Sequence, residues 1–323
     1  MNHYQFRINT LKTILFIASL LLLSVQTFAV DEQLHNGHIY LKPKWHEPFS
    51  TMPRNFGTFF SDSFSKDKIG PWAAIAASTT LLVIYDRKIL NETQRVGRRL
   101  GIGNDDHTSD MLKVGSVSIF RGPTDIGSAI YFFGDGWTTF ALTASFLGVG
   151  AYTQDYRALQ TGSQLFQGLL MTGLVTQTIK RTTGRESPIS SSTETGVWRP
   201  FPSFSTYNSR ISKYDAFPSG HLATTVMAVT IISENYEEYT WIKPLGYTMA
   251  SLLAFQMVNN SVHWASDYPL GMAIGYMMGK SISKNGRKKI GSETTATTDN
   301  VTYDWGPKLT AEGNLAMGVD ISY

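Results

Sequence analysis

The stretch Phe217-Pro218-Ser219-Gly220-His221 has the residue types of an anion-binding turn, and the apolar segment LATTVMAVTII follows it directly. Backbone N–H groups at a helix start are unpaired and attract anions. A Ser hydroxyl adds a donor, and Gly lets an anion approach the backbone. A His in this first turn can donate a proton to a departing oxygen. We favour this functional interpretation over an ordinary helix cap with a half-exposed His.

A second stretch, His263-Trp264-Ala265-Ser266-Asp267, places an imidazole and a carboxylate four residues apart. On helical backbone this spacing puts both side chains on one face. The carboxylate can hold one imidazole nitrogen as a donor and leave the other free as a nucleophile or base. A purely structural His–Asp pair has the same spacing, so the pair alone does not decide between the two.

A third stretch runs from Lys180 to Pro188, reads KRTTGRESP, and follows a charge-free segment. Lys180, Arg181 and Arg185 place three cations within six residues. Such a group can hold a phosphate through charge-assisted hydrogen bonds. Basic residues also often cap helix C-termini or mark a membrane boundary, and this simpler interpretation is preferred for the stretch alone.

Together the three stretches resemble the phosphatidic acid phosphatase type 2 / vanadium haloperoxidase superfamily. That family has a helical-bundle core and three ordered motifs. The first begins with Lys and ends in Arg-Pro, the second is Pro-Ser-Gly-His, and the third runs from Ser-Arg through His to Asp. The second motif is intact here, and His263 and Asp267 match the third with the expected gap. The resemblance covers about residues 70–282.

The resemblance implies a role for each matching residue. His263 attacks phosphorus and forms a phosphohistidine, Asp267 orients and charge-stabilises it, and His221 protonates the leaving alcohol. Histidine on both sides of the displacement makes a metal unnecessary, so we expect no metal site and no cofactor. The equatorial oxygens, where charge develops, are expected to be held by Lys180, Ser219 and the amide of Gly220.

Both arginines of the family motifs are missing from their usual places. Ser187 stands where the first motif ends in Arg, and Gln256-Met257 stand where the third begins with Ser-Arg. A lost bidentate contact costs about 2–4 kcal/mol of transition-state stabilisation. Arg185, two residues from Ser187, is the expected phosphate-binding substitute. The further candidates are Arg181, Arg210 and Lys213.

Long charge-free segments predict an all-α fold. Residues 136–154 and 158–179 carry no charge and show few alternations of β-branched residues. Pro71 begins another helix that continues to Asp86. We expect a helical bundle of about six core helices, with a short terminal strand in the last stretch, GNLAMGVDISY.

The N-terminus has the pattern of a signal peptide, which we assign to residues 1–29. Arg7 and Lys12 precede the apolar run 13–25, and Ala29 provides a small residue for cleavage. An uncleaved anchor is the alternative, although the run is short for a span. The remaining boundaries are an extended entry segment with at most short helices at 30–69, a phosphatase-like helical domain at 70–282, and a polar linker and tail at 283–323.

The composition excludes several classes of protein and site. Of the 323 residues, 16% are charged, which excludes a disordered chain and disfavours a basic nucleic-acid binder. No cysteine is present, which excludes disulfides, zinc–thiolate sites and thiol nucleophiles. Loss of Arg7 and Lys12 would lower the net charge from +3 to +1, so charge gives no strong attraction to anionic partners.

The location relative to the membrane is open at this stage. Several segments are long enough to span the hydrocarbon. The mean hydropathy of −0.12 is low for a chain of membrane spans, and Gln and Asn residues interrupt the segments. A membrane-embedded bundle and a water-soluble one both fit, with a slight preference for the soluble form. We expect export, to the periplasm or to the inner membrane with a periplasm-facing active site.

The leading expectation is an exported, metal-independent phosphatase that acts on a phosphomonoester or lipid phosphate through phosphohistidine. One alternative is a vanadate-dependent haloperoxidase, which needs many cations around vanadate. The other is a catalytically weakened homologue that binds phosphate or lipid. The retained His221, His263 and Asp267 favour chemistry, whereas the missing arginines favour the weakened protein. The expected partners are a phosphorylated small molecule or lipid and a membrane surface, with no nucleic acid; the oligomeric state is not determined.

Overall fold

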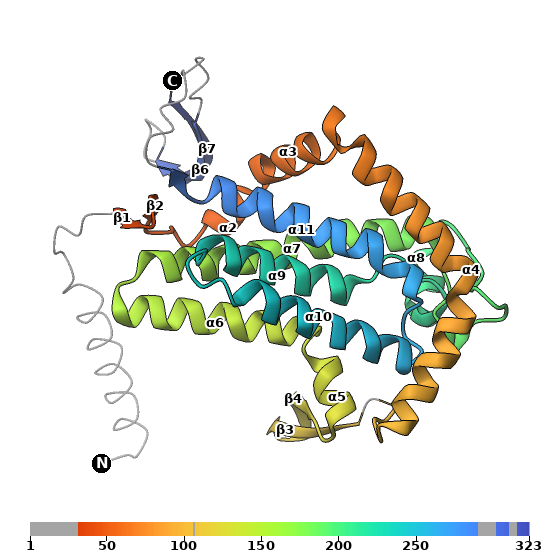
Figure 1. The fold of residues 1–323 in the computed structure, drawn as a ribbon. Coiled ribbons are helices and arrows are strands. Elements are labelled where there is room, and N and C mark those ends of the chain that lie inside the picture. The colour runs from red at the N-terminus through yellow and green to blue at the C-terminus, as the bar shows by residue number, and fades with distance from the viewer. Residues whose placement is uncertain (1–31, 106, 290–301, 310–314, 323) are drawn as a thin grey trace, which may run out of the picture.

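The computed structural model describes residues 32–105, 107–289, 302–309 and 315–322, and within them the chain is mostly helical (Figure 1). This confirms the expected all-α class with minor strands. The signal-peptide prediction falls outside these residues, as do residues 290–301, 310–314 and 323 of the predicted linker and tail. The long helices are α4 (Ile69–Arg99), α6 (Gly136–Thr153), α7 (Tyr156–Thr183), α9 (Gly220–Asn235), α10 (Ile242–Asn259) and α11 (Tyr268–Asn285).

Shorter elements connect these helices and flank the bundle. The short helices are α2 (Glu47–Ser50), α3 (Met52–Ser63), α5 (Ile126–Phe132) and α8 (Phe204–Ser209), with single 3-10 turns at η1 (Lys66–Lys68), η2 (Pro188–Ser190), η3 (Ile211–Lys213) and η4 (Ala265–Asp267). Three antiparallel sheets are formed by β1 (Glu32–His35), β2 (His38–Leu41) and β5 (Lys288–Lys289), by β3 (Thr108–Val114) and β4 (Val117–Pro123), and by β6 (Thr302–Leu309) and β7 (Leu315–Ser322).

Helix α9 is central in the bundle, with α7, α10 and α11 packed around it and α6 packed on α7 (Figure 1). Its buried residues contribute to two apolar clusters. Leu222 and Val226 pack with Leu253 of α10, whereas Met227 and Ile231 pack with residues of α7 and α11. The N-terminal end of α9 therefore projects from a well-packed core, which fixes the position of its first turn.

A row of glycines brings α11 into backbone contact with α9. An added Cβ at Gly275 would lie 2.1 Å from the carbonyl oxygen of Ala223, and one at Gly271 would lie 2.7 Å from that of Ser219. Gly279 is similarly close to α9. Glycines spaced four residues apart allow such an approach because no side chain separates the backbones. This close contact holds the turn before α9 against the start of α11.

Helix α4 is longer than expected. Pro71 does lie in its first turn, but the helix continues beyond Asp86 to Arg99. It crosses the end of the bundle at which α9 begins (Figure 1). Among the described residues, one helical segment, Lys66–Arg99, is long and apolar enough to span a membrane. Only 6% of its most apolar stretch is buried inside the protein.

One stretch differs from the expected secondary structure. The segment at 30–69 is not mainly extended, since it contains the hairpin β1–β2 and the 12-residue helix α3. Between α4 and α5, the strands β3 and β4 make a hairpin that turns at Gly115 (φ +61°). The expected terminal strand is present as β7, paired with β6.

The polar amides in the charge-free helices have partners within the protein. Gln167 of α7 donates to the Pro48 carbonyl at 2.6 Å and accepts from Asn55 at 2.6 Å. Gln164 accepts from Asn235 of α9 at 2.7 Å, although its own amide nitrogen has no hydrogen-bond partner. Because the amide of Gln167 is satisfied internally, it does not argue against a lipid environment for the bundle.

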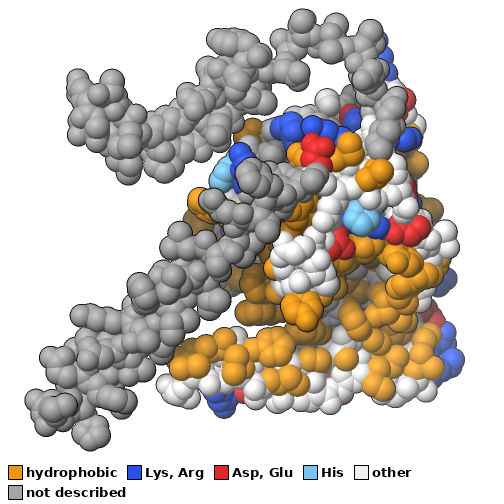
Figure 2. All heavy atoms as spheres, turned by 90° about the vertical axis from the view of Figure 1, so that its left-hand side faces the viewer, with side chains coloured by type: hydrophobic (Ala, Val, Ile, Leu, Met, Phe, Trp, Pro, Cys, Tyr) orange, Lys and Arg blue, Asp and Glu red, His pale blue; other side chains and the backbone are white. Residues whose placement is uncertain are grey.

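Hydrophobic side chains are widely exposed on the outside of the bundle. Figure 2 views the end opposite the start of α9 and shows hydrophobic side chains over much of that face. On α6, Phe140 is 48% and Val149 57% exposed, and on α4, Ile84 is 69% exposed. Exposed apolar area on this scale is typical of protein or membrane contact surfaces.

The glycine contact gives a test of the packing. We expect Gly275→Ala to lower the free energy of unfolding by about 1–3 kcal/mol, because α11 must move away from α9. Gly173→Ala on α7 is the matched control, since no atom lies within 4 Å of its added Cβ. It should keep or slightly raise stability, by about 0.5–1 kcal/mol. If chemical denaturation gave the same loss of unfolding free energy for Gly275→Ala and Gly173→Ala, the close contact between α9 and α11 would be contradicted.

Candidate active site

The turn before α9 has the predicted structure. Ser219 is the N-cap, and its hydroxyl accepts from the backbone N–H of Leu222 at 3.4 Å. Gly220 begins the helix and His221 follows in the first turn, where both are partly exposed. The free N–H groups of this helix start can therefore bind an anion beside the imidazole.

His263 does not lie on a helix, which corrects one expectation. Helix α10 ends at Asn259, and Ser261 with φ +58° turns the chain, so His263 lies in the loop before η4. The predicted pairing is nevertheless present: His263 Nδ1 lies 3.3 Å from Asp267 Oδ2, which also accepts from the Trp264 N–H at 2.8 Å. The other imidazole nitrogen, Nε2, is left for chemistry.

The two imidazoles meet at this end of the bundle. The ring centroids of His221 and His263 are 6.1 Å apart, with an interplanar angle of 74°. A backbone hydrogen bond links their turns directly, since Ser219 N–H donates to the Asp267 carbonyl at 3.0 Å. Reacting atoms must approach to about 3–3.5 Å, so one phosphoryl group fits between rings at this separation.

Lys180 lies beside the same turn, at the end of α7. Its Nζ would be 3.8 Å from a Cβ added at Gly220. The side chain is buried, which lowers the pKa of the ammonium, although the nearby carboxylates of Asp215 and Asp267 oppose this effect. Asp215 Oδ2 is 3.7 Å from Lys180 Nζ. The structure thus brings the predicted cation to the predicted anion site, already facing a carboxylate.

Arg185 is in the site but does not provide the expected phosphate clamp. Gly184, with φ +58°, reverses the chain after α7 and directs the side chain into the core. There one guanidinium nitrogen donates to Asp267 and Ser266 at 2.6 Å, and the other donates to Asp86 at 2.7 Å and to a carbonyl. Since both terminal nitrogens are taken, only Nε–H is uncommitted.

The positions of the missing motif arginines are filled by small or apolar contacts. Ser187 is buried and its hydroxyl donates to Asp215 at 3.5 Å. Met257 is fully buried, and its sulfur accepts from Ser219 Oγ at 3.7 Å. Of the further candidates, Arg181 lies over the ring of Tyr207 instead. Arg210 and Lys213 lie on the segment between α8 and α9.

Three residues of the site were not predicted from the sequence. Asp86 of α4 accepts from the Ser266 N–H at 3.1 Å and from the Ser266 hydroxyl, in addition to Arg185. Asp215 faces Lys180, and the Tyr131 hydroxyl lies 3.4 Å from His221 Nε2. A carboxylate directly after a long charge-free run, as at Asp86, is the one sequence signal that could have suggested a buried role.

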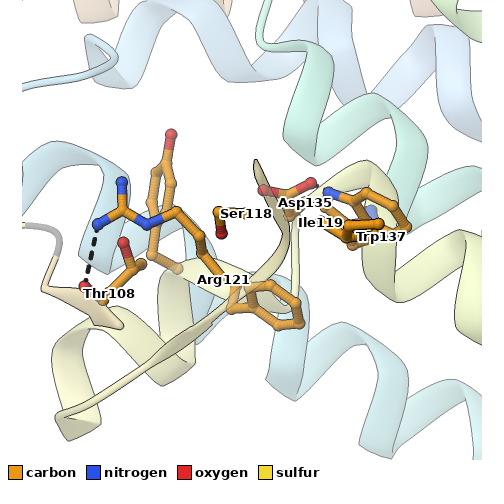
Figure 3. A pocket seen from close by; sticks show the side chains of 8 residues that line it. Thr108, Ser118, Ile119, Arg121, Asp135 and Trp137 are labelled. Atoms are coloured by element: carbon orange, nitrogen blue, oxygen red, sulfur yellow. Dashed lines mark hydrogen bonds between the residues drawn. The ribbon is translucent and has the colours of Figure 1, made fainter. Parts of the chain in front are cut away.

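A cavity of about 290 Å³ lies next to Tyr131, between the β3–β4 hairpin and the start of α6 (Figure 3). Arg121 of β4 points across it and donates to the Thr108 carbonyl at 3.2 Å. Asp135 and Trp137 lie on the other side in the close-up. Tyr131 lines the cavity and lies next to His221, whereas neither imidazole is among the residues that line it.

The environment of His221 favours the neutral imidazole. Burial lowers its pKa to about 3, and the positive charges of His263 and Lys180 act in the same direction. A neutral His221 can accept a proton, and it can donate one only after binding of an anion raises its pKa.

Comparisons with known proteins agree with this geometry. The family model described as the PAP2 superfamily matches residues 162–290, which include the three motifs. This part of the chain is therefore similar to the PAP2 superfamily. Another similar protein is the lipid A 1-phosphatase of Porphyromonas gingivalis, 36% identical over 67 residues. That match covers 20% of this chain and only 15% of the relative's length.

A solved PAP2 structure was also found by comparison of folds. It is the crystal structure of a transmembrane PAP2 type phosphatidylglycerolphosphate phosphatase from Bacillus subtilis, matched with a TM-score of 0.36 and 13% identity. The match covers 74% of this chain and 96% of that one.

The buried ion pairs of Asp86 give a prediction for stability. We expect Asp86→Ala to lower the free energy of unfolding by about 3–5 kcal/mol, because it leaves the buried Arg185 without one of its carboxylates. Glu92→Gln on the same helix is the control. Because Glu92 pairs with Arg95 on the surface, this variant should lower the free energy of unfolding by less than about 1 kcal/mol. Equal losses of unfolding free energy in the two variants, measured in denaturant, would show that the ion pair of Asp86 does not stabilise the fold.

The neutral His221 predicts a dependence of stability on pH. Its folded-state pKa of about 3 is below the ordinary value of 6.5, so below pH 6.5 the unfolded chain binds a proton that the folded chain does not. The difference in unfolding free energy between wild type and His221→Gln should fall as the pH drops from 6.5 toward 3, by at most about 1.4 kcal/mol per pH unit. A flat difference over this range would refute the neutral, desolvated imidazole.

Proposed function

We propose that this protein is a phosphatase that hydrolyses a phosphomonoester, in preference a lipid phosphate, through a phosphohistidine intermediate. The observation that carries the proposal is the pair of imidazoles 6.1 Å apart, one held by Asp267 and the other at an anion-binding helix start. The match of residues 162–290 to the PAP2 family model and the similarity to a lipid A 1-phosphatase support it.

In the proposed first step, His263 Nε2 attacks phosphorus in line with the leaving oxygen. The P–O ester bond breaks as the P–N bond forms. His221, which is protonated once the bound phosphate raises its pKa, passes this proton to the departing alcohol and becomes neutral. Asp267 accepts the hydrogen bond from Nδ1 and stabilises the positive charge that forms on the His263 ring. The Gly220 N–H, the Ser219 turn and Lys180 would stabilise charge on the equatorial oxygens.

In the second step, water attacks the phosphohistidine on the same axis. His221, now neutral, takes a proton from this water, and the P–N bond breaks to release phosphate and regenerate His263. The lowered pKa of His221 keeps its imidazole in the neutral form, which is the form that can accept a proton in this step. His263 supplies the nucleophile and His221 the proton transfers, so the mechanism assigns no step to a metal ion.

A lipid substrate is supported by the surface of the bundle. Ile84 of α4 and Phe140 of α6 are exposed, and α4 meets the length and composition of a membrane span. Helices α6 and α10 are each 18 residues, or about 27 Å, which is close to the thickness of the hydrocarbon. We propose that this surface contacts lipid and that the enzyme acts outside the cytoplasm.

The haloperoxidase alternative gains no support from the site. The two buried cations described at the site, Lys180 and Arg185, already face carboxylates. Vanadate, which stays bound through many cationic contacts in that activity, would find few free partners here. The weakened-homologue alternative is addressed by the activity measurement below.

The test is hydrolysis of phosphatidate in mixed micelles and of p-nitrophenyl phosphate in solution. We expect release of phosphate from both, with the higher kcat/KM for phosphatidate. His263→Ala should reduce kcat at least about 10³-fold and His221→Gln about 10²–10⁴-fold. Rapid quenching at neutral to alkaline pH should trap acid-labile phosphate on wild type and not on His263→Ala.

The control variant is His35→Ala, on β1 at the opposite end of the bundle, which should keep full activity. Retention of activity by His263→Ala would disprove the phosphohistidine mechanism. Absence of turnover by a folded wild type on both substrates would favour the phosphate- or lipid-binding alternative instead.

A further inference from the structure

The charges around the phosphate site do not favour a doubly charged anion. Lys180 faces Asp215 at 3.7 Å, and Arg185 binds Asp86 at 2.7 Å and Asp267 at 2.6 Å. Among the described ion pairs that meet at the site, three carboxylates thus oppose two cations. When these five side chains are counted in their charged forms, they carry one net negative charge before any substrate binds.

Asp215 is the carboxylate of this group that a substrate can reach. The side chains of Asp86 and Asp267 are fully buried, whereas that of Asp215 is 27% exposed. Its position is set by the backbone, because residue 215 bridges to Arg185 and the Ala216 N–H donates to the Arg185 carbonyl at 3.1 Å. It is therefore a fixed, accessible negative charge beside Lys180.

Asp215 also occupies the neighbourhood of the missing motif arginine. Its Oδ1 accepts from the hydroxyl of Ser187, the residue that stands in place of that arginine. Where the family motif would supply a cation, this chain presents a neutral hydroxyl and a carboxylate. The polarity of this side of the pocket is thereby reversed, and a phosphate dianion is repelled there.

We propose that Asp215 is a specificity-determining residue that selects phosphate esters whose alcohol carries an ammonium group close to the phosphate. In a 2-aminoethyl ester the ammonium lies roughly 4–5 Å from phosphorus. A phosphate on Lys180 would then place this ammonium within reach of Asp215, and the ion pair would offset the excess negative charge. This proposal rests on the proposed phosphatase function.

The test compares O-phosphoethanolamine with propyl phosphate, which differ only by an ammonium in place of a methyl group. We expect wild type to favour O-phosphoethanolamine by about tenfold in kcat/KM, the size expected of a partly exposed ion pair. Asp215→Asn should bring the ratio to within about twofold of unity. Glu194→Gln is the control of equal charge change, since Glu194 pairs with Arg87 and is 81% exposed; it should keep the preference.

A binding measurement keeps this test separate from the phosphatase proposal. Calorimetric titration with inorganic phosphate should give about tenfold tighter binding to Asp215→Asn than to wild type, whether or not turnover occurs. Asp215→Ala should bind phosphate as tightly as Asp215→Asn does. Agreement between the two variants guards against a folding defect in either one. Unchanged phosphate affinity in both folded variants, or a substrate ratio that Asp215→Asn does not alter, would overturn the role of Asp215. Full activity of His263→Ala would instead overturn the phosphatase mechanism.

Discussion

The buried guanidinium of Arg185 is the interaction on which the arrangement of the site depends. It is fully buried and bridges two fully buried carboxylates, Asp86 from α4 and Asp267 from η4. Charges removed from water are tolerated only when they are paired and hydrogen-bonded, so each member requires the other two. Through Asp267 this triad also orients His263, which ties the distant helix α4 to the geometry of the imidazole.

The same triad explains why Arg185 is not free to hold phosphate. A guanidinium that neutralises two carboxylates cannot also offer a bidentate face to a third anion. In the function that we propose, binding of phosphate then depends on the helix start at Gly220, on Ser219 and on Lys180. The proposed site would rely more on backbone dipoles, and less on side-chain cations, than a site with both motif arginines.

Local sequence signals predicted the parts of the site that are local in space. The charge-free segments marked the bundle helices, Ser219 proved to be the N-cap of α9, and the spacing of His263 and Asp267 marked their contact even though the backbone between them is not α-helical. Residues joined over long distances gave no such signal: Asp86 lies 99 positions before Arg185. Arg185 was misjudged because nearness to Ser187 in sequence says nothing of the left-handed turn at Gly184.

The glycine row of α11 has a mechanical consequence. Because Gly271 touches the Ser219 carbonyl and Gly275 touches α9, the two helices cannot slide past one another without a clash of main-chain atoms. The turns that carry the two imidazoles are thus parts of one stiff body, and the gap between them has a set width. Ligands of different size must therefore be accommodated by the segment from α8 to α9 or by the β3–β4 hairpin. The glycine contacts between α9 and α11 do not hold these two sides of the site in place.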